Sequence, residues 1–593
     1  MYLNKYYKFA GFVVLALMLG GVLAVAVSEV HSFDVFWQLQ SGRYMWENGS
    51  FIRTDLFTLK PDSPRYEHSW LHDLILFWTY QIAGYGGISV LKGVLVFATG
   101  AILVLVAKIR ESSWAATALV FPVFMFTSGG WLERPQLWTF LLFALFVLVL
   151  EVACRRRSWL ILWVFPLAVM WANLHAGSVL AIALTGAYLV GNFADGIIRK
   201  SFDRGLMIKL ASALGLICTA AFATPYPEKL LNTLLFSTKL GAKVDASGKI
   251  TGRSVAVFNM DWTPTTFQTE PTFFYALGVV VVIMLLGWRR LNLADVCLLA
   301  GLTLMGMKLV RHIPFFYMGA LAIIPAYLDA AARPVIDRMP SPARILGWVV
   351  CLVCALWMFW IAGQPLYKTY GSFNRGLRTW HYPIEAAEFI DQNKLAANLY
   401  NTYDWGGYLA WKLFPDYSVF WDGRQTSKKM FDLGWTVMAG KPEWQEILDT
   451  FDVKTIVTRA STIDTGQRYP LLDRLRKSEN WFLVFNDESS MIFVKRGSMP
   501  EAWMQKHVRP KRMMDDTILA EALLMVKVNP KRYMAWWEMS QIFLKRKDYK
   551  GALVTIRQHI ARSPRPHPQA LKIRDQLEQH LKKVSQQKQQ SQK

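Results

Sequence analysis

Three residues that could do chemistry follow the first apolar run at intervals of three. They are His31, Asp34 and Trp37, within VHSFDVFW. If a surface helix begins at His31, the three side chains fall near one face. A carboxylate beside an aromatic ring at a membrane surface can act as a general base, or as a ligand for a divalent ion, on a donor linked to a lipid phosphate. The alternative is structural: Asp34 caps the helix and Trp37 is an interfacial aromatic residue.

A second polar stretch, YEHSWLHD, contributes Glu67, His68 and Asp73. Carboxylates and imidazoles together suit a divalent ion or a phosphate group, but their order does not match the HExxH pattern of zinc enzymes. A divalent ion, Mg²⁺ or Mn²⁺, is one cofactor to consider, although these residues are only a weak metal signal. The sequence does not assign the metal ligands.

Polar residues also stand at the ends of later apolar runs. They are Arg134 in WLERPQ, Asn173 and His175 in WANLHAG, and Arg311 and His312 in VRHIPFF. Arginine binds phosphate through two parallel hydrogen bonds, so this set could hold the phosphate of a lipid-linked donor. The alternative is that the arginines extend their head groups to the interface and the histidines are structural.

A conspicuous motif, YDWGGYLAWKLFPDYSVFWDGR, lies further along the chain and holds Asp404, Asp422 and Arg424. These three side chains could bind an acceptor sugar. The Gly–Gly pair and the Asp–Gly turn also have ordinary structural uses, and the residue types alone favour the structural interpretation.

The composition indicates a membrane protein. Of 593 residues, 53% are hydrophobic and 14% aromatic, which is too apolar for a soluble protein, and the chain is too long for one domain. The formal net charge is +23, but the basic residues form short clusters between apolar runs and in the C-terminal tail. This distribution argues against a nucleic-acid partner and favours contact with membrane lipid or glycan.

A membrane-spanning helix needs about 20 mostly apolar residues, and about eleven segments approach that criterion. They are 9–29, 86–108, 114–128, 136–153, 158–172, 177–195, 205–223, 272–288, 294–309, 313–330 and 343–363. Basic clusters such as CRRRS and GWRR follow alternate segments, so the positive-inside rule predicts a cytoplasmic N-terminus. The last segment then carries everything after about residue 365 to the outside.

We predict four regions along the chain. Residues 1–364 form an α-helical multi-span domain with long outer loops at 30–85 and 224–271, and residues 365–500 form an α/β domain outside the membrane because short strands alternate there with helices. Residues 501–583 are helical, and AWWEMSQIFLKRKDYKGALVTIRQHIARSP matches the tetratricopeptide pattern, which suits a protein partner. Residues 584–593 form a disordered tail.

Several motifs occur in one order along about residues 1–500. They are FDVFWQLQSGRYMWENGSFIRTDLFT, YEHSWLHDLILFWTYQIAGYGG, ERPQLWTF, WANLHAG, RHIPFF and the YDWGG motif above. In these motifs the sequence resembles a large group of bacterial multi-span proteins that often carry tetratricopeptide repeats. The membrane part resembles the GT-C glycosyltransferase superfamily.

The resemblance implies a GT-C fold in the bacterial inner membrane, a polyprenyl-phosphate-linked sugar donor, and transfer on the outer side. It also implies a catalytic acid in the first outer loop, which by position is Asp34. Basic and polar groups in the other outer loops would hold the donor phosphate, with Arg134, His175, Arg311 and His312 as candidates. The first loop has His31-x-x-Asp34 where the family commonly has a D-x-D or E-x-D pair, so the resemblance does not fix metal dependence.

The sequence therefore predicts a membrane glycosyltransferase that acts on an extracytoplasmic acceptor, which is a polysaccharide, a lipid or an exported protein. The alternative is a non-catalytic scaffold in envelope polysaccharide assembly or export that uses the outer α/β domain and the repeat. A transporter would place ionisable groups near mid-span and repeat its spans. In this sequence the ionisable groups cluster at the outer ends instead.

Overall fold

The computed structural model describes residues 2–59, 64–156, 158–220, 222–227, 243–244, 250–251, 263–370, 375–424 and 427–590. The chain divides into two compact units, which we describe separately. A helical unit comprises Met1–Ser32, Ser41–Phe51 and Tyr66–Leu377. A mixed unit comprises Phe33–Gln40, Ile52–Arg65 and Arg378–Lys593.

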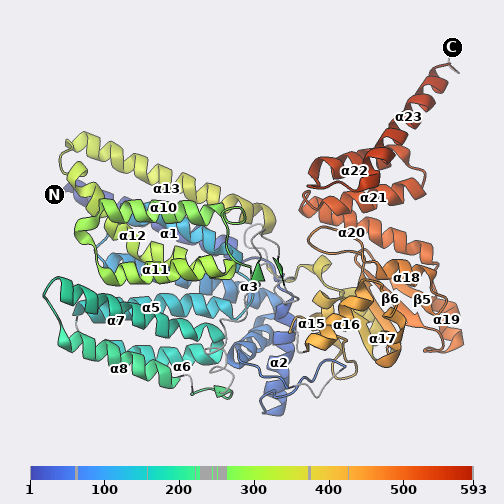
Figure 1. The fold of residues 1–593 in the computed structure, drawn as a ribbon, viewed down its shortest axis with the longest axis horizontal. Helices are drawn as coiled ribbons and strands as arrows, with labels where there is room; N and C mark the ends of the chain where they lie inside the picture. The colour runs from blue at the N-terminus through green and yellow to red at the C-terminus, as the bar shows by residue number, and fades with distance from the viewer. Residues whose placement is uncertain are drawn as a thin grey trace. The chain divides into compact units, whose positions relative to one another are not determined.

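Apolar helices that run side by side build the helical unit (Figure 1). In the described part of the chain, six helices are long and apolar enough to cross a membrane. They lie within α1 (Tyr2–Ala26), α3 (Trp70–Ile109), α5 (Gln136–Arg156), η3–α7 (Ala176–Ser178 and Val179–Ile198), η8–α12 (Val310–His312 and Ile313–Ile336) and α13 (Ser341–Tyr370). These helices indicate a membrane protein.

Shorter helices complete this unit. They are α4 (Trp114–Val120), η1 (Phe121–Gly130), η2 (Trp159–Trp163), α6 (Val164–Leu174), α8 (Arg204–Ala220), α10 (Pro271–Leu286), η7 (Trp288–Arg290) and α11 (Leu293–Lys308). A two-residue strand pair, β1 (Lys243–Val244) and β2 (Ile250–Thr251), lies in the predicted loop 224–271, most of which is outside the described residues. The expected total of about eleven spans stays a prediction.

A buried charge cluster joins five helices of this unit at Arg110, the residue that caps the C-terminal end of α3. Its guanidinium pairs with Glu151 of α5 and Asp295 of α11, and all three side chains are at most 6% exposed. Tyr188 of α7 donates to Glu151 (2.8 Å) and Tyr327 of α12 donates to Asp295 (2.9 Å). The charge of Arg110 therefore serves inside the bundle.

A four-stranded sheet lies in the mixed unit, in the order β3–β4–β6–β5. Its strands are β3 (Leu399–Asn401), β4 (Thr455–Arg459), β5 (Trp481–Asn486) and β6 (Ser490–Lys495). Strand β4 runs parallel to β3 and antiparallel to β6, with Ile456 opposite Tyr400 and Phe493. All five residues of β4 are buried, as expected for a strand with a neighbour on each side.

Helices surround the sheet and continue to the C-terminal end. They are η9 (Thr379–His381), α14 (Ile384–Asn393), η10 (Tyr403–Trp405), α15 (Gly406–Leu413), α16 (Lys428–Met438), α17 (Trp444–Thr450), α18 (Leu471–Lys477), α19 (Glu501–His507), η11 (Lys511–Met513), α20 (Met514–Val528), α21 (Tyr533–Lys545), α22 (Tyr549–Arg562) and α23 (Pro568–Gln590). Helix α23 extends to Gln590, so most of the tail expected to be disordered is helical. Lysine and glutamine have good helix propensity, and low complexity alone did not reveal this.

Two stretches of the first predicted outer loop belong to the mixed unit, namely residues 33–40 at the start of α2 (Asp34–Asn48) and residues 52–65. Phe36 is fully buried with its ring centroid 4.6 Å from that of Tyr382 and 4.8 Å from that of Tyr408. Thr58 bridges to Val419. The local sequence pattern, which predicts that the whole loop belongs to the membrane domain, does not show this long-range packing.

Candidate functional site

The helical unit contains an elongated cavity of about 1130 Å³. Its walls come from α4, η1, α10, α12 and α13, and most of the lining is apolar. Two lining residues, Val279 of α10 and Trp357 of α13, are 57% and 61% exposed. The cavity therefore opens to the surroundings along helices that are apolar enough to face lipid.

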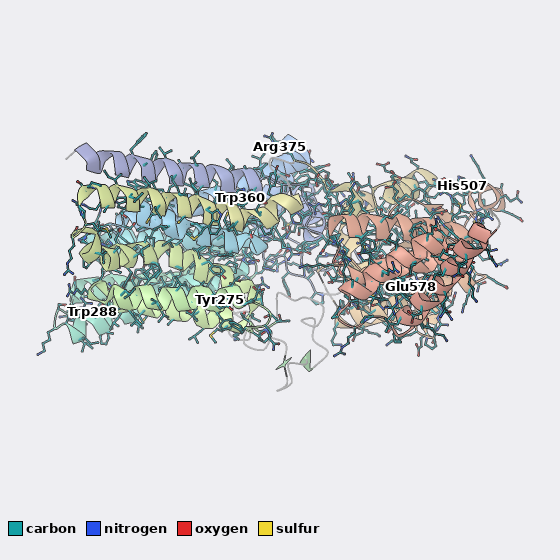
Figure 2. The ribbon with its side chains drawn as sticks, turned by 90° about the horizontal axis from the view of Figure 1, so that it is seen from above. Tyr275, Trp288, Trp360, Arg375, His507 and Glu578 are labelled. Carbon is teal, nitrogen blue, oxygen red and sulfur yellow. The ribbon has the colours of Figure 1, made fainter. Side chains whose placement is uncertain are left out.

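The cavity follows the helices for most of their length. Its lining runs from Thr272 to Ile283 on α10, a rise of about 16 Å, and from Ile313 to Leu328 on α12, a rise of about 22 Å. Figure 2 shows Tyr275, near the start of α10, and Trp288, just past its end, toward opposite ends of the bundle. A trough of this length exceeds one leaflet of a bilayer, which is about 15 Å deep, and suits an extended lipid chain.

One end of the cavity is polar. Arg134, Gln136, Glu270 and Arg311 line it there, next to the N-terminal ends of α5, α10 and α12. The partial positive charge of three helix N-termini adds to the two guanidiniums, so this end attracts an anion. The sequence predicts both arginines as phosphate ligands but does not single out Glu270, whose neighbours in QTEPT carry no charge.

An internal ion pair fixes the turn that carries Arg134. The preceding residue, Glu133, is fully buried and pairs with the buried ammonium of Lys92 on α3. Its carboxylate also accepts the backbone N–H groups of His31 (3.4 Å) and Ser32 (3.2 Å), while Arg134 donates through Nε to the Ser32 hydroxyl (3.2 Å). Burial alone would raise the pKa of Glu133, but Lys92 and His31 outweigh it and lower the pKa to about 2. The carboxylate is therefore ionised at neutral pH and holds the turn in place.

His175 lies between α6 and η3, where two hydrogen bonds define its tautomer. Thr139 accepts a bond from Trp171 (2.9 Å), so its own O–H donates to Nδ1 of His175 (2.7 Å), which also accepts Gly177 N–H (3.2 Å). This pattern assigns the proton to Nε2. Burial, together with the positive fields of His68, Arg311 and His72, holds the pKa of His175 well below its ordinary value. The structure thus brings His68, His175 and Arg311 within electrostatic reach of one another.

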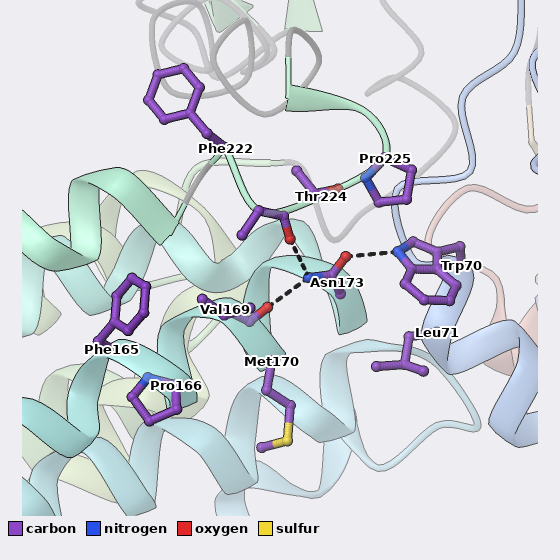
Figure 3. A pocket seen from close by; sticks show the side chains of 11 residues that line it. Trp70, Leu71, Phe165, Pro166, Val169, Met170, Asn173, Phe222, Thr224 and Pro225 are labelled. Carbon is purple, nitrogen blue, oxygen red and sulfur yellow. Dashed lines mark hydrogen bonds between the residues drawn. The ribbon is translucent and has the colours of Figure 1, made fainter.

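Asn173 lines a separate groove of about 800 Å³ on the same unit (Figure 3). Its amide oxygen accepts Trp70 Nε1–H (2.8 Å), and its amide nitrogen donates to the carbonyls of Val169 and Ala223 (2.8 Å each). These hydrogen bonds join α6 to the start of α3 and to the segment after α8. They support the structural interpretation of Asn173.

The other predicted residues of the helical unit are packed inside it. Glu67 and Asp73 are fully buried at the start of α3, and His312 lies against Phe315 with ring centroids 6.4 Å apart. In the described part of the chain, no group of three His, Cys, Asp or Glu side chains is arranged to hold a metal ion. Dependence on Mg²⁺ or Mn²⁺ therefore stays a prediction.

Asp34 is the first residue of α2, so the prediction of a helix beginning at His31 is wrong by three residues. The break leaves His31 outside the helix, where its Nδ1 lies 3.0 Å from the Glu29 carbonyl oxygen. Within the mixed unit, Asp34 accepts a hydrogen bond from Trp37 Nε1–H (3.3 Å). A Cβ placed on Gly423 would lie 2.9 Å from Asp34 Oδ1, so glycine allows the carboxylate to approach this backbone closely.

Asp404 is the second acid near Asp34 in the mixed unit. Burial raises the pKa of Asp404 to about 6, the Arg459 guanidinium lowers it in part, and the carboxylates of Asp464 and Asp34 raise it further. The charge of Asp34 thus acts on Asp404, which lies about 370 residues further along the chain. The positions of the two residues along the chain do not reveal this interaction.

Asp422 and Arg424 form a buried ion cluster with Asp55. Arg424 Nη2 lies 2.9 Å from Asp55 Oδ1 and 2.5 Å from Asp422 Oδ2, and the three side chains are at most 1% exposed. The Arg424 Cζ atom also lies 4.6 Å from the centroid of the Phe57 ring. These contacts hold residues 52–65 against the rest of the mixed unit. They favour the structural interpretation of Asp422 and Arg424 over a role in acceptor binding.

No protein-family model and no curated protein matches the sequence. Among solved structures, the chain is similar to the cryo-EM structure of the arabinofuranosyltransferase AftD from mycobacteria, with a TM-score of 0.51 and 14% sequence identity. The match covers 83% of this chain and 40% of AftD, so the chain spans less than half the length of that enzyme. At this identity the similarity concerns the fold alone.

Proposed function

We propose that the protein is a membrane glycosyltransferase that uses a sugar donor linked to a polyprenyl phosphate. The observation that carries the proposal is the cavity of the helical unit. Most of this cavity is apolar and long enough for an extended lipid chain. Its polar end is lined by Arg134 and Arg311. The GT-C-like fold supports the same conclusion.

The polar end fits the charge that such a reaction develops. When the bond between the anomeric carbon and the phosphate oxygen breaks, the electron pair stays with the lipid phosphate. Arg134 and Arg311 would stabilise this leaving group more strongly than the ground-state donor. Guanidinium groups suit this task because they bind two phosphate oxygens at once.

The acceptor hydroxyl must lose a proton as its oxygen attacks the anomeric carbon. The resemblance to GT-C enzymes implies that Asp34 is the base that takes this proton, and this role is part of the proposal. Transfer at the outer face of the inner membrane, to a polysaccharide, lipid or exported protein, is part of the proposal. So is recruitment of a protein partner by the helices from α20 onward.

Native mass spectrometry of the detergent-purified protein tests the proposal. We expect wild type to carry a polyprenyl phosphate or its sugar conjugate, and Arg134→Ala and Arg311→Ala each to lower its occupancy by roughly tenfold to a hundredfold. Arg289→Ala is the matched control, because Arg289 lies in η7 beyond the opposite end of α10 and is exposed. Wild-type protein that carries only bulk phospholipid, or arginine variants that retain the lipid phosphate, would contradict the proposal.

A further inference from the structure

Glu270 contributes a carboxylate to the cavity that the two arginines also line. Among the described residues that line the cavity it is the one acid, whereas Arg134 and Arg311 are the basic ones. Glu270 forms no ion pair with either arginine, and in the described part of the chain its carboxylate has no hydrogen-bond partner. An acid in the wall of an anion-binding cavity opposes the binding of the anion, so it needs an explanation beyond phosphate binding.

The usual structural explanation does not hold for this residue. Glu270 occupies the N-cap position of α10, where a carboxylate normally accepts a backbone N–H of the first turn. The Glu270 side chain makes no such bond. It is half-buried in the cavity wall instead, and burial raises the pKa of its carboxyl group.

Neighbouring groups extend this polar surface. Thr272 and Tyr317 of α12 also line the cavity, and the side chains of Thr272 and Glu270 both act electrostatically on the Tyr317 hydroxyl. Two hydroxyls and a carboxylate therefore lie together at the start of α10, and Gln136 adds an amide to the same cavity. A carboxylate accepts hydrogen bonds and cannot donate them, so its natural ligand is a group with several O–H donors.

We infer that Glu270 binds the sugar of the donor through the sugar's hydroxyls and thereby selects a neutral sugar over an acidic one. The inference rests on the proposed function, in which the arginines hold the phosphate to which that sugar is attached. An acidic sugar would place its own carboxylate beside that of Glu270, and two like charges in a partly desolvated site repel. A neutral sugar instead donates charge-assisted hydrogen bonds, and a site built for such donors rejects ligands that lack them.

The test compares wild type, Glu270→Gln and Arg134→Ala by native mass spectrometry, with the bound lipid released and its mass measured. We expect Glu270→Gln to keep undecorated polyprenyl phosphate at the wild-type level and to lose the sugar-carrying form by roughly tenfold to a hundredfold. The mass released from wild type should correspond to a neutral sugar. Gln268→Ala is the control, because Gln268 precedes the same helix, is exposed and does not line the cavity.

The outcomes separate the two proposals. If Arg134→Ala loses the lipid phosphate while Glu270→Gln retains the sugar-carrying form, the inference about Glu270 is overturned and the proposed function stands. An acidic sugar on the wild-type protein overturns the inference in the same way. If wild type carries no lipid phosphate, both fail. Glu270→Asp guards against misfolding, because it keeps the charge and should retain more of the sugar-carrying form than Glu270→Gln.

Discussion

Lys92 and Glu133 form an ion pair inside the helical unit, with side chains that are 1% and 0% exposed. The ammonium comes from the middle of α3 and the carboxylate from the turn before α5, so the pair joins a membrane helix to the residue next to Arg134. A charge at this depth is costly unless it is paired. The pair therefore couples the stability of the bundle to the geometry of the proposed phosphate site.

The first prediction concerns the pH dependence of this pair. The pKa of Glu133 is lowered from 4.5 to about 2 in the folded state, so its contribution is complete above pH 4.5 and is lost as the pH falls toward 2. The shift corresponds to about 3 kcal/mol of unfolding free energy. Glu133→Gln should be less stable at neutral pH and should lose less stability on acidification, as measured by thermal unfolding in detergent. Glu111→Gln is the control, because the Glu111 side chain is 77% exposed; equal pH profiles for both variants would contradict the prediction.

The second prediction uses two arginines that pair with the same acid. Arg110→Ala leaves the buried carboxylates of Glu151 and Asp295 without their cation, and we expect a loss of about 3–5 kcal/mol in unfolding free energy. Arg155 also pairs with Glu151 but is 38% exposed, so Arg155→Ala should cost less than about 1 kcal/mol. Chemical denaturation in detergent measures both values. A similar small loss for both variants would show that burial does not determine the energy of this cluster.

The third prediction fills the apolar trough. Ala276 of α10 lines the cavity, and Ala276→Phe should displace the bound lipid while the arginines stay in place. Gly278→Phe on the same helix is the control, since an added side chain there meets open space and Gly278 does not line the cavity. Lipid occupancy by native mass spectrometry should fall for the first variant and not for the second. Loss in both would point to a change in α10 itself.

The fourth prediction concerns the carboxylate of Asp34. If it takes the proton of the acceptor, Asp34→Asn should fold normally and accumulate the sugar-carrying donor, because binding continues while transfer stops. Gly423→Ala should have a similar, weaker effect, since the added Cβ displaces Asp34 Oδ1 from its position. The ratio of sugar-carrying to undecorated lipid phosphate reports both effects, with Glu47→Gln on the same helix as the control. An unchanged ratio in Asp34→Asn would favour a scaffold without catalytic activity.

The fifth prediction follows from the raised pKa of Asp404. The folded state holds the proton of this group up to about pH 6, whereas the ordinary value is 3.8. Stability associated with this group is therefore complete below pH 3.8 and is lost as the pH rises through 6. Asp404→Asn removes the buried charge and should unfold at a higher temperature than wild type above pH 6, with a smaller difference near pH 4. Asp391→Asn, an exposed site, should show no such pH dependence.

Several features were predictable because they depend on local pattern. Apolar length identified the long helices, and β3 to β6 lie in the region where short strands were expected to alternate with helices. The residue chemistry of WLERPQ and VRHIPFF selected Arg134 and Arg311, which line one cavity. A charged residue at the end of an apolar run can be recognised from the neighbouring sequence alone, because ionisable groups at membrane depth usually face a cavity or a pathway.

Other features depend on contacts between distant segments. Asn173 and Arg424 have suitable chemistry for a site, but the fold satisfies them with internal partners. Glu270 has no distinctive neighbours in the sequence and becomes notable only because it shares a cavity with two arginines.

The sequence by itself determined that the chain is a membrane protein and which residue types could bind a phosphate, because both follow from composition and helix length. The tertiary structure decided which polar residues face a cavity and which are paired inside the protein. A side chain's hydrogen-bond partners are set by packing between elements that lie far apart in the chain. Burial then fixes whether its charge stabilises the fold or is available to a ligand.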